Sequence, residues 1–181
     1  MKYMFASDIH GSAAAARRIS EIYKKSGAKK LILLGDLLYH GPRNALPEEY
    51  DTQSVAGILN ELKDDIAAVR GNCDAEVDQL VLNFPMRADY AVMELNGIEF
   101  YVTHGHLASP DALPPMKEGQ AFISGHTHIP VLEKKDGIWL INPGSTSIPH
   151  GGFKASYAVL DEKHFTIYDL DGEVIMEAEL V

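Results

Sequence analysis

Five short polar clusters in the sequence each follow an apolar run. They are Asp8-Ile9-His10, Gly35-Asp36, Gly71-Asn72-Cys73-Asp74, His104-Gly105-His106 and Gly125-His126-Thr127-His128. Ligand and catalytic groups in α/β sheets gather beyond the carboxyl ends of strands, so we expect the five clusters to converge on one crevice. Their carboxylate, amide and imidazole groups are metal donors, and the sequence therefore predicts a metal site.

Seven donors from these clusters are the candidate metal ligands. They are Asp8, His10, Asp36, Asn72, His104, His126 and His128. Seven ligands are too many for one tetrahedral site, and they suit two sites that share a bridging carboxylate. Oxygen and imidazole donors without a thiolate fit manganese, iron, nickel or zinc better than calcium or magnesium. Two such ions would attract phosphate oxygens and lower the pKa of a bridging water.

The spacing within the clusters favours a shared site. Asp8 and His10 are two residues apart, as are His126 and His128. Residues i and i+2 of an extended chain project to the same side, so each pair can reach one metal region without a helix. A Gly-Asp dipeptide on its own is more often a turn, and the metal interpretation rests on five clusters in the same strand-end context.

The elements that must position these clusters divide the chain in two. Up to about residue 82, strands over 2–7, 31–34 and 66–69 alternate with helices over 12–26 and 52–62. Beyond residue 87 we expect strands over 90–95, 98–103, 131–135, 138–141, 156–160, 165–170 and 173–180, with Asn96-Gly97 and Asp136-Gly137 as hairpin turns. Two sheets packed face to face, with helices outside, accommodate these strands in one domain over residues 1–181.

Composition restricts the partners and the compartment. The 181 residues carry a formal net charge of −10 and are 46% hydrophobic, which is ordinary globular composition. An acidic surface repels nucleic-acid phosphates, so we expect no binding to long DNA or RNA. Cys73 is the only cysteine, and we see no signal peptide and no apolar run of about 20 residues. These features predict a cytoplasmic protein without membrane contact.

As an ordered set, these motifs resemble the calcineurin-like metallophosphoesterases. The resemblance covers residues 8–152, and it includes all five clusters in the family's order. The brevity of the chain, together with the segments His40-Gly41-Pro42-Arg43-Asn44 and Asn142-Pro143-Gly144-Ser145, is similar to the small bacterial YfcE-type phosphodiesterases.

The resemblance implies a fold, a ligand assignment and a reaction. The fold is α/β (α+β), a four-layer αββα sandwich of two mixed β-sheets flanked by helices. Asp36 would bridge two divalent ions, one of them held by Asp8, His10 and His128 and the other by Asn72, His104 and His126. Manganese is the ion we expect first, with iron, zinc and nickel as alternatives. A metal-bound hydroxide would attack a small phosphodiester, and similar small proteins are often homo-oligomers.

Cys73 departs from the pattern of the superfamily. Many members have a histidine there, which protonates the leaving oxygen or stabilises charge, whereas a thiol of ordinary pKa is neutral at pH 7. His40, His106 or a metal-bound water could replace it, and Arg43 could grip a phosphate oxygen with its planar guanidinium. We assign as catalytic Asn72, Cys73, Asp74 and His104, and as substrate-binding His40, Arg43 and His106.

Several of these residues have plainer interpretations. Arg43 and His106 are equally consistent with ordinary loop residues. Asp74 is expected to fix its loop or to orient a ligand. His150 in Pro149-His150-Gly151-Gly152 could lie near the crevice, but a plain turn is the preferred interpretation. His164, in the terminal run of strands, is interpreted as a surface or packing residue.

Two other classes of function compete with phosphodiester hydrolysis. The main alternative is a metal-binding scaffold of the same fold that binds proteins and has little or no catalysis, and the filled ligand positions argue against it. Metal-dependent amide hydrolysis would require a His-x-His-x-Asp-His cluster or a His-Glu-x-x-His helix, and the sequence contains neither.

Overall fold

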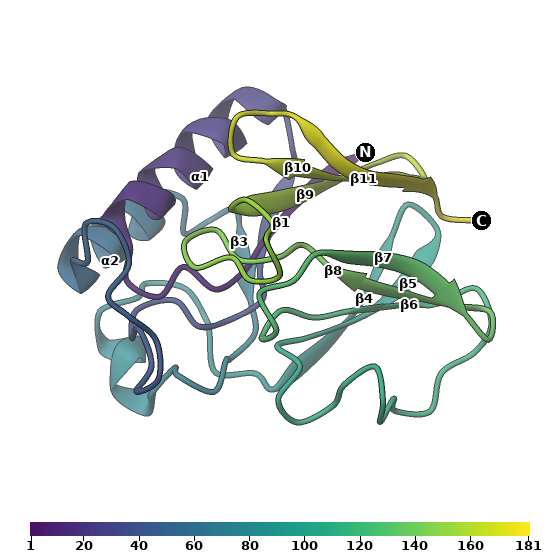
Figure 1. The fold of residues 1–181 in the computed structure, drawn as a ribbon, viewed down its shortest axis with the longest axis horizontal. Helices are drawn as coiled ribbons and strands as arrows, with labels where there is room; N and C mark the ends of the chain where they lie inside the picture. Colours follow the sequence, from purple (N-terminus) through teal and green to yellow (C-terminus); the bar gives the residue numbers. More distant parts are fainter.

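Two mixed β-sheets packed face to face form the centre of the computed structural model, which describes residues 1–181 (Figure 1). The first sheet contains β1 (Lys2–Ala6), β2 (Lys30–Leu33), β3 (Ile66–Ala68), β9 (Ser156–Asp161), β10 (His164–Asp169) and β11 (Val174–Glu179). The second sheet contains β4 (Tyr90–Leu95), β5 (Ile98–Thr103), β6 (Ala121–Ile123), β7 (Val131–Lys135) and β8 (Ile138–Asn142).

Each sheet has a parallel part that points toward the same region of the molecule. The first sheet has the order β11-β10-β9-β1-β2-β3. In it β1, β2 and β3 pair in parallel, whereas β9, β10 and β11 pair antiparallel with their neighbours. The second has the order β4-β5-β6-β8-β7, with β5, β6 and β8 parallel and antiparallel strands at both edges. The polar clusters follow β1, β2, β3, β5 and β6.

The continuous apolar run of β2 arises because both faces of the first sheet are covered. Leu31 and Leu33 lie in the core that faces the helices, whereas Ile32 and Leu34 lie in the core between the two sheets. β1 alternates in the same way. Alternate residues of the central strands therefore belong to two different cores.

Phenylalanine rings fill the space between the sheets. Phe5 of the first sheet stacks on Phe100 of the second at a centroid distance of 5.9 Å, and it contacts Phe165 at 5.5 Å. All three side chains are fully buried. Burial of these rings holds the sheets together and thereby fixes the separation of the loops that leave them.

Both α-helices lie on the outer face of the first sheet (Figure 1). The helix α1 (Ala13–Ser26) begins after Ser12, whose side chain accepts a hydrogen bond from the Ala15 N–H, and ends at Gly27 in the left-handed conformation. The helix α2 (Thr52–Asn60) begins after Asp51, which caps it in the same manner. Neither helix has the length and apolar character needed to cross a membrane.

The fold class that we expected, an α/β sandwich of two mixed sheets with helices, is confirmed. In one detail the structure differs from the expected layers. The segment 104–120, which lies beside the outer face of the second sheet, contains no helix. There Tyr90 and Tyr101 stack at 5.0 Å and line a hollow with Pro114, Pro115 and Met116. β6 and the short 3₁₀ helix η1 (Glu76–Leu80) were absent from the expected elements, and the single-domain assignment stays a prediction.

We predict that Phe100→Ala lowers the free energy of unfolding by about 3–5 kcal/mol, because it removes a fully buried ring and leaves a cavity between the sheets. Val92→Ala, on the exposed face of the same sheet, is the control and should cost about 0.5 kcal/mol or less. Urea unfolding followed by circular dichroism measures both variants. Equal losses for the two would contradict the assignment of the core.

Candidate metal centre

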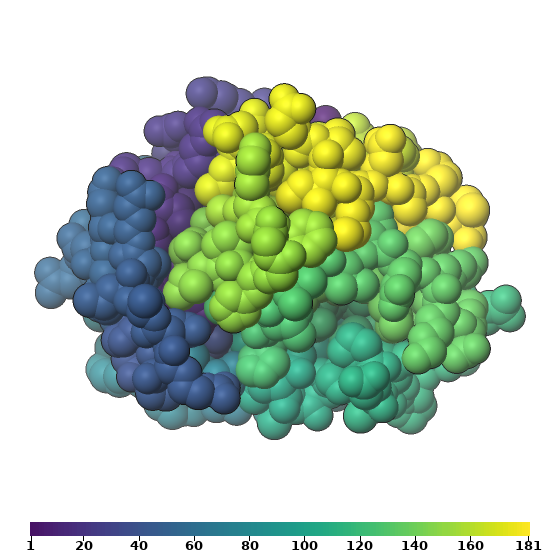
Figure 2. Space-filling view, viewed as in Figure 1, coloured from purple at the N-terminus to yellow at the C-terminus, as the bar shows by residue number.

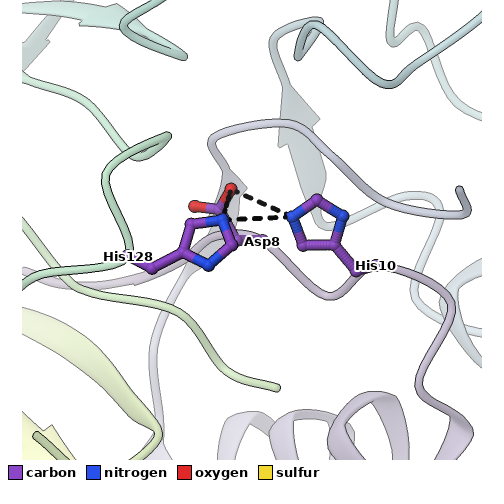
Figure 3. A group of neighbouring side chains, drawn as sticks. All are labelled: Asp8, His10 and His128. Atoms are coloured by element: carbon purple, nitrogen blue, oxygen red, sulfur yellow. Dashed lines mark hydrogen bonds and ion pairs between the residues drawn. The ribbon is translucent and has the colours of Figure 1, made fainter. Parts of the chain in front are cut away.

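The loops that follow β1, β2, β3, β5 and β6 bring the predicted donors together. In Figure 3 the carboxylate of Asp8 and the rings of His10 and His128 point toward one another. Asp8 Oδ1 lies 3.2 Å from His128 Nε2 and 3.5 Å from His10 Nε2. The two Nε2 atoms are themselves 3.2 Å apart. Three donor atoms, from two segments far apart in the sequence, thus face a common point.

A second group of donors lies beside the first, and Asp36 is adjacent to both. Its Oδ2 atom lies 3.5 Å from His10 Nε2 and 3.2 Å from His104 Nε2. His104 Nε2 is also 3.1 Å from Asn72 Oδ1. The ring of His126 lies edge-on to His104, with their centroids 5.2 Å apart. Asp36 therefore lies between the two groups of donors.

The orientation of three histidines is set by the backbone behind them. The Nδ1 atoms of His10, His104 and His128 lie 2.9, 2.7 and 2.7 Å from the carbonyl oxygens of Tyr39, Leu34 and Ile148. A carbonyl can only accept, so Nδ1 carries the proton and donates. In the neutral ring the Nε2 lone pair is then free and points into the site, as in protein metal centres.

Each of the two carboxylates has one oxygen fixed by the protein and the other directed at the site. Asp8 Oδ2 accepts hydrogen bonds from Ser7 Oγ at 2.6 Å and from the His126 N–H at 3.1 Å, while the Oδ1 atom is buried without a hydrogen-bond partner. Asp36 Oδ1 accepts from the Cys73 N–H at 2.8 Å. An unpartnered buried carboxylate oxygen is costly, and a cation would compensate for it. The donors present therefore fit divalent metal ions.

The ligand-bearing loops use left-handed backbone, which differs from the extended chain we expected. Asp8, His10, Asp36, His126 and His128 have φ values of 57°, 49°, 55°, 68° and 60°. This region is uncommon for residues other than glycine, and such residues cluster at functional sites. The i and i+2 side chains of each pair do reach one region, but through tight turns and not through strand geometry.

Two glycines allow the ligand loops to approach one another. A Cβ atom at Gly71 would overlap the carboxylate of Asp36, and one at Gly125 would lie 2.6 Å from Asp8 Oδ2 and overlap Ser7 Oγ. Neither position could hold a larger residue without displacing a predicted ligand. The glycines that precede Asn72 and His126 are thus required for close packing of the loops.

Asp74 lies behind the ligands and holds their loops together. Its carboxylate accepts hydrogen bonds from the backbone N–H groups of Asp36, Leu37 and Gly71 at 2.8, 2.8 and 2.7 Å. It is buried and does not line the cavity over the site. Of the two roles expected for Asp74, this geometry fits the fixing of its loop, and its assignment as a catalytic residue stays a prediction.

The buried charges of the site shift one another's pKa values. Burial by itself raises the pKa of Asp8, but the imidazoles of His10 and His128 lower it more, and it falls below its usual range. Burial lowers the pKa of His104, but Asp36 and Asp8 raise it to about 9, and the pKa of His10 is raised in the same way by Asp8. The metal-free centre therefore holds the anionic Asp8 carboxylate beside the cationic His104 imidazole at neutral pH.

A cavity of about 420 Å³ opens over the centre. It is lined by His10, Asp36, Gly41, Pro42, Arg43, Asn44, Asn72, Cys73, His126, His128 and His150. Burial and the nearby Asp36 carboxylate raise the pKa of the Cys73 thiol to about 12, so this side chain is neutral. The Arg43 side chain lines the cavity and is exposed, so it is accessible to a bound anion.

His40 and His106, expected to bind substrate, do not line this cavity. The ring of His40 packs edge-on between Tyr39 and Tyr50, at 4.8 and 5.2 Å. The ring centroid of His106 lies 5.5 Å from that of His104, and the pKa of His106 is lowered by burial and by the charge of His104. Their assignment to substrate stays a prediction, and the geometry gives Arg43 better access.

Sequence reasoning missed several residues that position the centre. Asn142 Nδ2 donates to the Gly125 carbonyl at 2.7 Å, and Ser145 Oγ donates to the Asp8 carbonyl at 2.8 Å. Both belong to the segment Asn142-Pro143-Gly144-Ser145, which resembles the YfcE-type phosphodiesterases but to whose residues we assigned no role from the sequence. His150 lines the cavity, whereas we preferred a plain turn to a place near the crevice for this residue.

Comparison with known proteins agrees with this geometry. The profile of the Calcineurin-like phosphoesterase superfamily domain matches residues 1–164. The chain is 48% identical over 176 residues to Phosphodiesterase YfcE of Escherichia coli K12, covering 97% of this chain and 96% of that protein.

Solved structures share the fold of this chain. YfcE, described as a phosphoesterase from E. coli, superposes with a TM-score of 0.98 at 47% identity and full coverage of both chains. Vps29 from Entamoeba histolytica, solved as a complex with zinc, shares the fold at a TM-score of 0.62 and 17% identity, also with full coverage of both chains. This chain therefore belongs to the calcineurin-like phosphoesterase superfamily and is an enzyme of that class.

Proposed function

We propose that this phosphoesterase hydrolyses small phosphodiesters at a centre of two divalent ions. Asp8, His10 and His128 would hold one ion, Asn72, His104 and His126 the other, with Asp36 between them. The observation that carries this proposal is the buried, unpartnered Oδ1 atom of Asp8, with two imidazole Nε2 atoms facing it within 3.5 Å. The 48% identity to a protein named a phosphodiesterase supports the choice of diesters.

The protein contributes orientation, charge and access. When bound, the two ions would supply a hydroxide nucleophile and neutralise charge on the phosphoryl group. The carbonyls of Tyr39, Leu34 and Ile148 hold three of the imidazoles in the orientation they need. On the cavity wall, the guanidinium of Arg43 can donate two hydrogen bonds to non-bridging phosphate oxygens.

The leaving group receives little help from Cys73. Its thiol is neutral and holds its proton tightly, with a pKa of about 12. A donor with so high a pKa is a poor general acid at neutral pH. We infer that diesters with acidic leaving groups, such as aryl esters, react faster than those with alkyl leaving groups.

Three finer features belong to the same proposal. Manganese is the ion we favour, since the donors are oxygens and imidazoles, with iron, zinc and nickel as alternatives. The cavity of about 420 Å³ suits a small substrate and not a long nucleic acid. We place the enzyme in the cytoplasm on the basis of its single cysteine.

We predict that Asp36→Asn and His126→Ala each abolish turnover of bis-p-nitrophenyl phosphate and lower the bound metal below two equivalents, while circular dichroism stays unchanged. Each change removes a proposed ligand at the edge of the cavity without opening the core. His164→Ala is the control, because this exposed histidine on β10 lies outside the site. Wild-type protein that binds two ions but hydrolyses no activated diester would favour the scaffold alternative.

We predict that metal binding at pH 7.5 releases protons. In the metal-free protein the pKa of His104 is raised to about 9, so this imidazole is cationic at pH 7.5 and must lose a proton to bind a metal. The pKa of His10 is raised as well. Apparent affinity for Mn²⁺ should therefore increase with pH and level off above about pH 9. Calorimetry in buffers of different ionisation enthalpy measures the release, and a buffer-independent heat would contradict it.

We predict that Arg43→Ala raises KM for bis-p-nitrophenyl phosphate by about 10- to 100-fold, the range expected for a lost hydrogen bond to a charged group. Arg43→Lys should recover part of this, because it keeps the charge but loses the planar pair of donors. Arg87→Ala is the matched control, since Arg87 pairs with Glu76 outside the cavity. Unchanged steady-state kinetics in Arg43→Ala would show that this side chain does not hold the phosphate.

A further inference from the structure

His150 has an exposed side chain whose only described contact within the protein is a ring stack. One face of its ring stacks on His128, with centroids 4.6 Å apart and planes 26° apart. The residue is exposed at the wall of the cavity. The ring is therefore available to a ligand in that cavity.

The backbone around His150 holds the ring in place. Its N–H donates to the carbonyl of His128 at 3.0 Å, and its own carbonyl accepts from the Phe153 N–H at 3.2 Å. Two residues earlier, the Ile148 carbonyl accepts from His128 Nδ1, and Ser147 Oγ donates to the Asp8 carbonyl at 2.9 Å. The backbone that carries this ring is thus fixed relative to the proposed metal centre, and the ring itself stacks on His128.

His150 is also the lining residue best suited to contact a planar group. The other histidines of the lining are proposed metal ligands, and Arg43 is assigned to phosphate. Asn44 uses its amide N–H to bond the His40 carbonyl, and Cys73 is a neutral thiol. Pro42 also lines the cavity, but its ring is saturated. The ring of His150 is therefore the one unsaturated ring of the lining that is assigned neither to a metal nor to the phosphate, and a planar substituent could stack on it.

The two walls of the cavity come from different parts of the chain. Figure 2 shows the segment around residues 40–50 in dark blue beside the segment around residue 150 in light green, and both line the cavity. The first wall offers the cation of Arg43, and the second offers the ring of His150. A phosphate ester with one aromatic substituent has the negative charge and the ring that these two walls would contact.

We propose that His150 forms a subsite for a planar aromatic substituent of the phosphodiester, which stacks on the exposed face of the His150 ring. This inference rests on the proposed function, because it takes the phosphoryl group to lie at the metal centre. An aromatic ring there would extend the offset stack that His128 and His150 begin. The preferred substrates are then diesters that carry an aryl ring or a nucleobase, and not dialkyl diesters.

The experiment compares phenylphosphonate with methylphosphonate, two non-hydrolysable anions that differ in the ring. Their dissociation constants are measured by calorimetry on the manganese-loaded wild type, His150→Ala and His150→Phe, with metal content determined for each. The wild type should bind phenylphosphonate about 2- to 10-fold more tightly than methylphosphonate, the range expected for one aromatic stack. His150→Ala should abolish this preference without weakening methylphosphonate, and His150→Phe should keep it.

Three results would overturn the subsite. They are equal affinities of the wild type for the two anions, an unchanged preference in His150→Ala, or a loss in His150→Phe as large as in His150→Ala. Weaker methylphosphonate binding or lower metal content in His150→Ala would assign the residue to the metal centre instead. Failure of the metal-loaded wild type to bind either anion would reject the proposed function itself, and the subsite with it.

Discussion

The structure depends on the burial of two carboxylate charges, those of Asp8 and Asp36, close to each other. The carboxylates of Asp8 and Asp36 are buried within 4.0 Å of the same imidazole, His104, and one oxygen of Asp8 has no hydrogen-bond partner. Burial of charge on this scale costs several kcal/mol per ion unless it is compensated. Protonated imidazoles can balance the charge, and divalent cations would do so with better geometry. The loops, the glycines and the left-handed residues all serve to keep these groups close.

Most of the ligand groups are tied to a loop other than their own. Asp8 accepts from the backbone of His126, Asp36 from that of Cys73, and His104 donates to the carbonyl of Leu34. Asp74 adds three further bonds from backbone N–H groups. Such second contacts fix the direction of each donor, which raises affinity by removing the cost of ordering the site at binding.

The sequence was sufficient to predict the parts of the molecule that local patterns determine. The hairpin of β4 and β5 was placed with correct ends because Asn96-Gly97 has the paired positive φ values that the turn requires. The polar clusters indicated the strand ends at which the donors meet. The positive φ of Asp8 and His128, the short strand β6 and the stacking of His150 could not be predicted, since each is set by contacts between distant segments.

The donors come from both halves of the sandwich. Asp8, Asp36 and Asn72 follow strands of the first sheet, while His104, His126 and His128 follow strands of the second. An ion shared between them would be a further cross-link at this edge, in addition to the phenylalanine core and the hydrogen bonds from His126 to Asp8 and from His104 to Leu34. Because a ligand that binds only the folded state stabilises it, metal supply would govern the lifetime of the folded chain as well as its chemistry. Scarcity of metal would then first separate the layers at the catalytic edge.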